Sequence, residues 1–405
     1  MTDEVTIERL GHLGDGIAAG PVFVPRTLPG EVVAGAREGD RIPAPKIRTP
    51  SAERVAAACP HYNSCGACAV MHATDAFVAD WKIGIVRHAL AGYGLDAPIA
   101  GIATSPPESR RRAVLSGRRT KKGALVGFHA RASDTITAIP SCRVVVPAIR
   151  AALAPLEALV VAGGSRKGEL AITVTDGPAG LDVAVAGGKT PDRALSEELA
   201  AIAGAADFAR LSWNDELVAQ ARAPFQMMDG LRVVPPPGAF LQATLAGEAA
   251  LREAVAGIAA GAERVVDLYA GCGTFALPLS RMAEIHAVEG LEALSSATFE
   301  GWRAEGGLHR LSVETRDLSS RPLVPLELDK FDAAVIDPPR AGAEAQMRAL
   351  VDSAVATIAA VSCNPATFAR DAAIAVAAGF AIREIRVVDQ FRWSPHIELV
   401  AHLAR

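Results

Sequence analysis

The sequence has few aromatic residues, little net charge and no long apolar run. Phe, Trp and Tyr make up 5% of its 405 residues, and the formal net charge is −4. No run of about 18 uninterrupted apolar residues occurs, which argues against a membrane-spanning helix. The N-terminus, MTDEVTIERL, is acidic and polar, whereas a signal peptide begins basic and turns apolar. We therefore expect a globular cytoplasmic protein of two or three domains, a monomer with no membrane contact and no protein partner.

Cysteine is also scarce, with six residues in the chain. A cytoplasmic chain rarely uses disulfides, so metal binding is the first explanation to consider. Cys59, Cys65 and Cys68 follow a C-x5-C-x2-C spacing, and Cys142 lies far downstream. Four thiolates suit an iron–sulfur cluster or a structural zinc ion, and the spacing does not decide between them. It differs from the C-x3-C-x2-C spacing of radical methyl-donor enzymes, so we infer no radical chemistry.

Positive charge is concentrated between residues 101 and 150, where only Glu108 and Asp134 oppose a series of arginines and lysines. Such a stretch can follow a phosphate backbone. It can equally be a solvated hairpin whose charged edges resist aggregation. Both interpretations stay open at this point.

Residues 1–50 predict a small antiparallel β-barrel. Three short apolar segments are separated by glycine turns: EVTIERLG, GPVFVP and EVVAGA. Pro43, Pro45 and Pro50 then indicate a linker. Residues 51–240 mix strand-like and alanine-rich segments, which predicts an α+β central domain. Within it we expect a helix over 72–92, with one face that holds Phe77, Trp81, Ile85 and His88.

From residue 241 to 405 the pattern becomes a regular alternation of helices and apolar strands. Predicted strands include RVVDLYAG, IHAVEG, LSVETRD, FDAAVIDPP and TIAAVSCN, with two final strands close enough in sequence to pair. This alternation is typical of a doubly wound, Rossmann-like α/β sheet. The fold class is therefore α/β, with a small β-barrel and a mixed domain ahead of the sheet.

The loop after RVVDLYAG indicates a bound cofactor. Gly271 and Gly273 allow a tight turn, but the third glycine of a dinucleotide fingerprint is missing. Acids stand at the strand ends instead: Asp267, Glu289 and Asp317. S-adenosylmethionine offers an ammonium, a ribose diol and an adenine amine, all of which favour acceptors. We therefore expect Glu289 at the ribose and Asp317 near the adenine. The alternative is a nucleotide-binding or purely structural α/β domain.

Two further motifs bear on the reaction. Asp337-Pro338-Pro339 follows the fourth strand, and alone it suggests methylation of an exocyclic amine of a nucleic-acid base. Carbon 5 of a pyrimidine, by contrast, becomes reactive only after a thiolate adds to carbon 6, and a base must then remove the carbon 5 proton. Cys363 fits the first role and Glu398 the second, with His396 as a weaker base. Cys363 can also be a small buried apolar residue, as most free cysteines are.

Several of these motifs together resemble the RNA 5-methyluridine methyltransferase family. They are FLQAT (240–244), DLYAGCGTFALPLS (267–280), VEG (288–290), DPPRAG (337–342), SCNPATFARD (362–371) and HIELV (396–400). LGHLGDGIA and FVPRTLPGE look like a TRAM RNA-binding barrel. The set of Cys59, Cys65, Cys68 and Cys142 is similar to the family's [4Fe-4S] pattern.

The resemblance implies roles for particular residues. Cys363 would be the nucleophile and Glu398 the proton acceptor. Gln242, Tyr269, Gly271, Glu289, Asp317 and Asp337 would surround S-adenosylmethionine. The cysteines would hold an iron–sulfur cluster rather than zinc. Because both the barrel and the cysteines are present, the chain is most similar to the 23S rRNA branch of the family.

Four alternatives remain beside methylation of a uridine in 23S rRNA. The substrate could be a tRNA, or the base could be a cytosine, which shares the thiol chemistry. The D-P-P element keeps an amino-methyltransferase of nucleic acid in view. Finally, the chain could be an RNA-binding protein without catalytic activity, in which the donor domain is inert.

Overall fold

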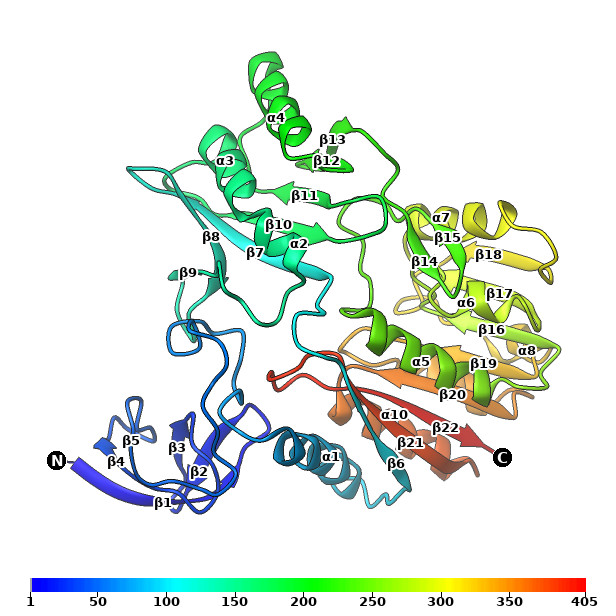
Figure 1. The fold of residues 1–405 in the computed structure, drawn as a ribbon. Coiled ribbons are helices and arrows are strands. Elements are labelled where there is room, and N and C mark those ends of the chain that lie inside the picture. The colour runs from blue at the N-terminus through cyan, green and yellow to red at the C-terminus, as the bar shows by residue number, and fades with distance from the viewer. Residues whose placement is uncertain (1) are drawn as a thin grey trace.

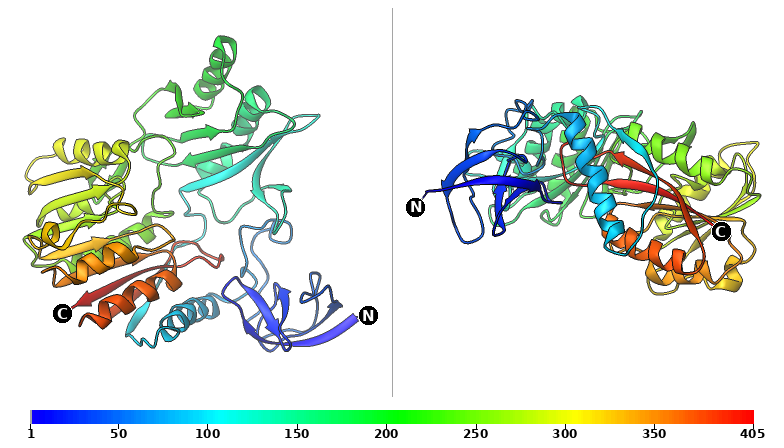
Figure 2. Two further views of the ribbon diagram at one scale, coloured as in Figure 1. Left: turned by 180° about the vertical axis from the view of Figure 1, so that it is seen from behind. Right: turned by 90° about the horizontal axis from the view of Figure 1, so that it is seen from below.

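The structure, a computed structural model, describes residues 2–405 (Figure 1). Strands form four sheets of five, seven, two and eight strands. Among the described residues, no helix combines the length and the apolar character needed to cross a membrane. Figure 2 shows the five-stranded sheet beside one end of the eight-stranded sheet, with helix α1 (Asp75–Ala91) between them.

The N-terminal sheet is antiparallel, in the order β3-β2-β1-β4-β5. Its strands are β1 (Thr2–Leu10), β2 (Asp15–Ala18), β3 (Val22–Pro25), β4 (Val32–Ala36) and β5 (Lys46–Thr49). Ile7, Val24, Val33 and Ile42 form its core. The three predicted strands are confirmed. The short strands β2 and β5 were missed, because four residues each give too little alternation to recognise.

Helix α1 is confirmed but begins three residues later than predicted, at Asp75, where the Thr74 side chain accepts a hydrogen bond from the Phe77 amide. The buried face of the helix differs from the one that holds Phe77, Trp81, Ile85 and His88. The buried residues are Val78, Lys82, Val86 and Leu90, of which the first three lie one position, and the last two positions, beyond those residues. The helix contacts two bodies at once. Val86 and Leu90 pack on the eight-stranded sheet. Phe77 and Trp81 are partly buried and pack toward the N-terminal sheet, called the barrel below, and toward residues 59–73, called the cysteine loop.

The central body is a seven-stranded sheet in the order β13-β12-β11-β10-β7-β8-β9, covered by α3 (Leu153–Gly163) and α4 (Arg193–Ala205). Its strands are β7 (Arg112–Arg119), β8 (Ala124–His129), β9 (Ile136–Ala138), β10 (Leu170–Thr175), β11 (Asp182–Ala186), β12 (Arg210–Trp213) and β13 (Glu216–Gln220). The short helix α2 (Pro147–Ala151) precedes α3, and a small hairpin of β14 (Gln226–Met228) and β15 (Leu231–Val233) follows. The basic stretch is therefore mainly the β7–β8 hairpin.

The eight-stranded sheet has the order β18-β17-β16-β19-β20-β22-β21-β6. Its strands are β6 (Ile99–Thr104), β16 (Arg264–Leu268), β17 (Glu284–Glu289), β18 (Leu311–Thr315), β19 (Ala333–Ile336), β20 (Thr357–Ser362), β21 (Ala381–Asp389) and β22 (Glu398–Ala404). Seven strands run in the same direction, and β22 inserts antiparallel between β20 and β21. The doubly wound sheet is confirmed. Its last strand, β6, comes from the range expected in the central domain.

Helices cover both faces of this sheet (Figure 1). One face packs on α1, α8 (Pro325–Leu328), α9 (Glu344–Val351) and α10 (Pro365–Ala377). The other packs on α5 (Leu245–Ile258), α6 (Ala276–Leu279) and α7 (Glu292–Arg303). Burial on both faces explains why the parallel strands are continuous apolar runs. Because parallel strands end at one edge, Asp267, Glu289, Asp337 and Cys363 reach the same edge of the sheet.

Candidate active site

The loop after β16 has the backbone of a ligand-binding turn. Gly271 and Gly273 adopt positive φ angles of 58° and 87°, and Tyr269 lies in the same left-handed region at 62°. This conformation is unfavourable for a tyrosine, and such strain is concentrated at functional sites. A Cβ on Gly273 would lie 2.8 Å from the side chain of Leu277, whereas one on Gly271 would meet open space. The loop thus leaves room for a ligand at Gly271, whereas it is tightly packed at Gly273.

Acidic side chains surround this loop. Asp267 is fully buried, and neither of its carboxylate oxygens has a hydrogen-bond partner among the described residues. Burial, and next the charge of Asp337, raise the pKa of Asp267 well above its usual value. Glu289 accepts hydrogen bonds from the amides of Gly271 (2.9 Å) and Leu291 (3.0 Å). The unpaired, buried oxygens of Asp267 need a hydrogen-bond donor or a cation nearby. S-adenosylmethionine offers both, whereas a pyrophosphate is an anion and would be repelled.

Asp317 lies at the exposed side of the same region. It accepts hydrogen bonds from the Ser320 hydroxyl and the Ser319 amide, both at 2.9 Å, and these bonds hold its pKa below the usual value. Tyr269 lies near it: burial, and then the charge of Asp317, raise the pKa of Tyr269 to about 12. The structure thus brings Tyr269, Gly271, Glu289 and Asp317 together around one loop.

Two glutamines connect the donor side of the site to the base expected at Glu398. Gln242 donates to Asp337 at 3.4 Å, and Gln390 donates to Gln242 at 2.5 Å. Gln390 also lies within hydrogen-bonding reach of Glu398 and accepts from the Ala243 amide at 2.7 Å. Burial raises the pKa of Asp337 to about 7. Sequence reasoning missed Gln390, although a polar residue directly after the apolar strand β21 is a usable signal.

Cys363 and Glu398 face each other across two neighbouring strands. Strands β20 and β22 are antiparallel, with Ser362 opposite Leu399, so the next pair in this register is Cys363 and Glu398. Burial, followed by the charges of Glu398 and Asp337, raises the pKa of Cys363 to about 11. The pKa of Glu398 is raised well above its usual value by burial and by Asp337. A thiol and two carboxyl groups therefore share one poorly hydrated space.

A cavity of about 430 Å³ opens beside Cys363. Arg340 and His396 line it together with the apolar residues Pro365 and Ile397. The Nδ1 atom of His396 lies 3.0 Å from the Arg340 guanidinium. Burial and the charge of Arg340 lower the pKa of His396 to about 4, so this imidazole is a neutral acceptor. This weakens His396 as the base relative to Glu398.

The loop between β21 and β22, which ends at Glu398, is held by a buried lysine. Lys82 of α1 is fully buried, and its ammonium donates to Asp389 (2.6 Å) and to the carbonyls of His396 (2.9 Å) and Phe391 (3.3 Å). On the other side of the loop, the carbonyl of Trp393 accepts hydrogen bonds from the amides of residues 69 and 70 in the cysteine loop. Sequence reasoning gave no indication of this role for Lys82.

The four predicted metal ligands lie near one another. Cys59, Cys65 and Cys142 are buried and Cys68 is partly buried. Burial raises the pKa of Cys65, Cys68 and Cys142, and the charges of the neighbouring cysteines raise each one further. Within residues 2–405, no three His, Cys, Asp or Glu side chains are arranged to hold a single metal ion. The sixth cysteine, Cys272, is fully enclosed in the core.

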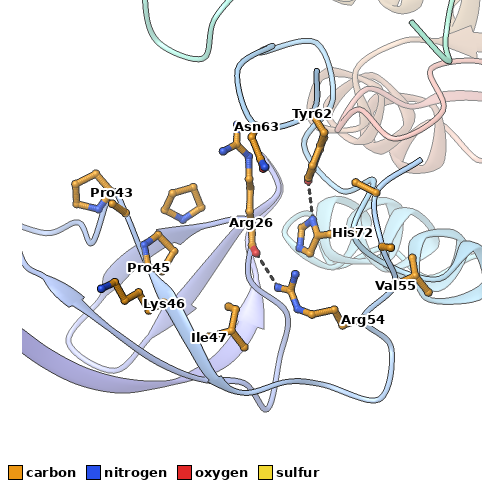
Figure 3. Close-up of a pocket in the computed structure, with 14 residues that line it drawn as sticks. Arg26, Pro43, Pro45, Lys46, Ile47, Arg54, Val55, Tyr62, Asn63 and His72 are labelled. Atoms are coloured by element: carbon orange, nitrogen blue, oxygen red, sulfur yellow. Dashed lines mark hydrogen bonds between the residues drawn. The ribbon is translucent and has the colours of Figure 1, made fainter. Parts of the chain in front are cut away.

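A second cavity, of about 670 Å³, lies between the barrel and the cysteine loop (Figure 3). Arg26 has a positive φ of 58°, and its carbonyl accepts a hydrogen bond from Arg54 at 2.8 Å. Arg54 in turn pairs with the fully buried Glu31 at 2.5 Å. The Arg26 guanidinium lies 5.3 Å from the ring centre of Tyr62, whose hydroxyl lies 2.6 Å from the Nδ1 atom of His72. Arg26 and Lys46 bring positive charge to the cavity, while the charge of Arg54 is paired with Glu31.

Comparisons with known proteins agree with this geometry. Residues 310–405 match the family model described as tRNA (Uracil-5-)-methyltransferase. The whole chain aligns with an uncharacterized RNA methyltransferase of Mesorhizobium japonicum at 44% identity, covering 98% of that protein. It also aligns over its full length with the 23S rRNA (uracil(1939)-C(5))-methyltransferase RlmD of Chromohalobacter salexigens at 34% identity, covering 89% of it.

Among solved structures, the chain is similar to the tRNA (uracil-54, C5)-methyltransferase of Pyrococcus abyssi, which was crystallised with S-adenosyl-L-homocysteine. The TM-score is 0.77 over 99% of both chains, at 22% sequence identity, and this likeness supports the fold. The full-length relatives support more than the fold, because they share over 30% of their residues along the entire chain. The protein is thus an S-adenosylmethionine-dependent enzyme and belongs to the RNA 5-methyluridine methyltransferase family.

Proposed function

We propose that the protein methylates carbon 5 of one uridine in 23S rRNA through a transient bond between Cys363 and the base. The observation that carries this proposal is the position of Cys363 opposite Glu398 in the register of β20 and β22, at the edge of the sheet that bears the donor loop. A nucleophile and a base in adjacent places are what substitution at an unreactive ring carbon requires.

Each chemical step then has a residue. The Cys363 thiolate adds to carbon 6, and the electron pair moves to carbon 5 as an enolate. Carbon 5 would then take the methyl group of bound S-adenosylmethionine, whose bond between carbon and sulfur would break so that S-adenosylhomocysteine leaves. Glu398 accepts the carbon 5 proton, the double bond re-forms, and the bond between sulfur and carbon 6 breaks. Gln390, which contacts Glu398, would keep that carboxyl group in place.

The donor would lie among the residues around the glycine loop. Glu289 and Asp317 offer acceptors for the ribose and the adenine, and Tyr269 covers the same side. Gln242 and Asp337, which are joined by a hydrogen bond, would lie between the donor and the nucleophile. The unpaired oxygens of Asp267 support this assignment, since a cationic ligand nearby would offset their burial.

The choice of 23S rRNA rests on the relative of that name at 34% identity, and on the presence of both a barrel and a cysteine set. A tRNA is the second candidate, because the matching family model and the similar archaeal structure are both named for tRNA. Bacterial rRNA is transcribed and modified in the cytoplasm, so the enzyme would act there. One chain supplies every proposed catalytic residue, so a monomer suffices.

We further propose that Cys59, Cys65, Cys68 and Cys142 hold a [4Fe-4S] cluster. Three of them, Cys59, Cys65 and Cys142, are buried and Cys68 is partly buried, and burial together with the charges of neighbouring cysteines raises the pKa of Cys65, Cys68 and Cys142, which supports their lying near one another. A cubane cluster is larger than one ion and spreads its four ligands wider than tetrahedral zinc does. Analysis of anaerobically purified protein tests this: iron with sulfide supports the cluster, and one equivalent of zinc contradicts it.

The barrel and the central body would bind the RNA. The cavity of Figure 3 combines Arg26, Lys46 and Arg54 with the ring of Tyr62 and a floor of prolines. Cations beside aromatic and proline surfaces suit a single-stranded nucleotide, whose phosphate is anionic and whose base stacks. The β7–β8 hairpin adds further arginines on the central body.

The decisive experiment compares substitutions at the two proposed catalytic residues. Cys363→Ala should abolish methyl transfer and leave no covalent complex with RNA that contains 5-fluorouridine. Glu398→Gln should also lose turnover, but it should accumulate a covalent complex with RNA that contains ordinary uridine, since addition to carbon 6 does not need the base. Mass spectrometry of rRNA and tRNA from a deletion strain identifies the missing nucleotide. Turnover by Cys363→Ala would refute the mechanism, and a missing methylated amine would support the D-P-P alternative.

A further inference from the structure

The turn between β1 and β2 of the barrel forms part of the wall of the cavity beside Cys363. His12 and Leu13 line that cavity together with Cys363 and Pro365 of the C-terminal sheet and Ile85 of α1. Figures 1 and 2 show this end of the barrel next to the loop that connects β21 and β22. A module expected to add only RNA affinity therefore reaches the cavity beside the proposed nucleophile.

This turn is held rigidly. The Gly11 amide donates to Asp15 at 2.7 Å, and the Gly14 amide donates to Gly11 at 2.9 Å. Gly14 has a φ of 83°, and a Cβ added there would lie 2.8 Å from the side chain of Ala69 in the cysteine loop. Asp15, which is buried, pairs with Arg131 of the central body at 2.5 Å. The tip of the turn cannot move far without disturbing three neighbouring segments.

Leu13 is nevertheless exposed. Its side chain is 61% accessible, while Gly11 and Gly14 on either side of the tip are buried. A single exposed leucine needs no explanation on most surfaces. Leu13 differs from such a residue, because its turn holds the side chain at the cavity that contains Cys363. Ile85, Pro365 and Ile397 are further apolar residues in the lining of that cavity. The apolar surface fits the face of a base better than it fits a phosphate.

A uridine stacked in folded RNA cannot reach Cys363 until it leaves its stack. Proteins that distort nucleic acids commonly insert an apolar side chain, often leucine, into the gap between bases. We propose that Leu13 is a substrate-positioning residue that packs into the space left by the target uridine and so holds the uridine turned out toward Cys363. This inference rests on the proposed uridine methylation, but it holds equally for rRNA and tRNA.

The test compares Leu13→Ala with the conservative Leu13→Met and with Leu217→Ala as a matched control. Leu217 lies on β13 and is 59% exposed, so it is as accessible as Leu13 but does not line the catalytic cavity. Two substrates are used: the folded RNA domain that contains the mapped uridine, and a short single-stranded oligonucleotide of the same local sequence. The oligonucleotide needs little unstacking, so it does not need a wedge.

For Leu13→Ala we expect kcat/KM on the folded RNA to fall about 10- to 100-fold, which corresponds to the removal of one stacking interaction. On the oligonucleotide the decrease should stay below about threefold, and calorimetric affinity for S-adenosylmethionine should not change. Leu13→Met should retain most activity. The fluorescence of a 2-aminopurine placed beside the target uridine should increase when wild-type enzyme binds, but not when Leu13→Ala binds. Equal decreases on both substrates, or no decrease on the folded RNA, would overturn the inference. Failure of the proposed function is distinguishable, because wild-type enzyme would then methylate no uridine.

Discussion

Cys363 has surroundings that oppose the ionisation its proposed role requires. Burial, and after it the charges of Glu398 and Asp337, raise the pKa of this thiol, and Arg340 opposes them only in part. Burial also raises the pKa of Asp337, and burial followed by the charge of Asp337 raises the pKa of Glu398. A positively charged sulfonium beside these groups would favour the ionised form of all three. The site is therefore expected to be poorly reactive until the donor binds.

The raised pKa of Cys363 predicts how the alkylation rate of this thiol depends on pH. With a pKa of about 11, Cys363 is mostly a neutral thiol at neutral pH, so alkylation by iodoacetamide should be slow. Its rate should rise about tenfold for each pH unit between about pH 7 and 10, because the thiolate fraction rises by that factor. Mass spectrometry of the Cys363 peptide, in protein without donor, measures this rate.

Glu398→Gln is the control for that measurement. It removes one of the two charges that hold the pKa of Cys363 high, so the variant should be alkylated faster than the wild type at about pH 8. A wild-type rate that already levels off between about pH 8 and 9 would contradict the proposed electrostatic effect of the two acids.

The residues at strand ends could be predicted well, and the polar residues between them could not. Parallel strands end at one edge, so Glu289, Asp337 and Cys363 could be grouped from their positions alone. Gln390 directly follows β21, but its hydrogen bonds to Gln242 and to the Ala243 amide span about 150 positions of sequence and could not be foreseen. The pairing of Arg340 with His396 depends on side-chain directions that one sequence does not encode.

At the scale of elements, helix α1 connects the cysteine loop to the catalytic loop. Lys82 donates to Asp389 and to two carbonyls of the segment that precedes Glu398. Burial lowers the pKa of Lys82, and the charge of Asp389 opposes that effect. An ammonium without solvent needs its partners, so the pair fixes the start of β22 relative to α1.

Lys82→Met should be strongly destabilising, because it leaves Asp389 buried without its partner. The expected cost is about 3–5 kcal/mol in the free energy of unfolding, observed as a lower melting temperature by calorimetry. The double variant Lys82→Met/Asp389→Asn removes both charges and should recover much of this stability. A single variant that melts within about a degree of the wild type would show that the pair is not stabilising the loop.

Elements were predictable where their pattern was long. The buried parallel strands β16, β17, β19 and β20 are apolar runs, and all were expected. The buried face of α1 could not be predicted, because its buried residues include Lys82. Hydrophobic periodicity assigns a lysine to the exposed face of a helix. Pairing with Asp389, more than 300 positions away, makes that burial possible.

For the whole molecule, the barrel, helix α1 and the C-terminal sheet together line the cavity beside Cys363. The cavity of Figure 3 lies on the same barrel and carries Arg26 and Lys46. RNA that enters the pocket while touching the barrel would therefore bind over an extended surface. Electrostatic attraction to phosphates makes such binding dependent on salt.

Replacing Arg26 and Lys46 by Gln should weaken RNA binding, and the effect should be larger at low salt. The slope of log K against log salt should fall by about one for each phosphate that is no longer neutralised. Fluorescence anisotropy with rRNA from a deletion strain measures the affinity, and kcat at saturating RNA should change little. Arg193→Gln is the control, since this arginine is highly exposed on α4 and lines neither cavity. An unchanged slope in the double variant would exclude the cavity from RNA binding.

The eighth strand of the catalytic sheet also bears on the order in which the protein is made. Ile99 of β6 pairs with Ile385 of β21, which follows nearly 300 residues later in the sequence. Strand β6 therefore leaves the ribosome long before its partner. During translation β6 and α1 have no sheet to join, and a fragment that begins at residue 241 would expose the nine-residue β21 as an open edge. The last segment synthesised thus closes a structure that the first quarter of the chain began, so truncation from either end should leave an aggregation-prone product.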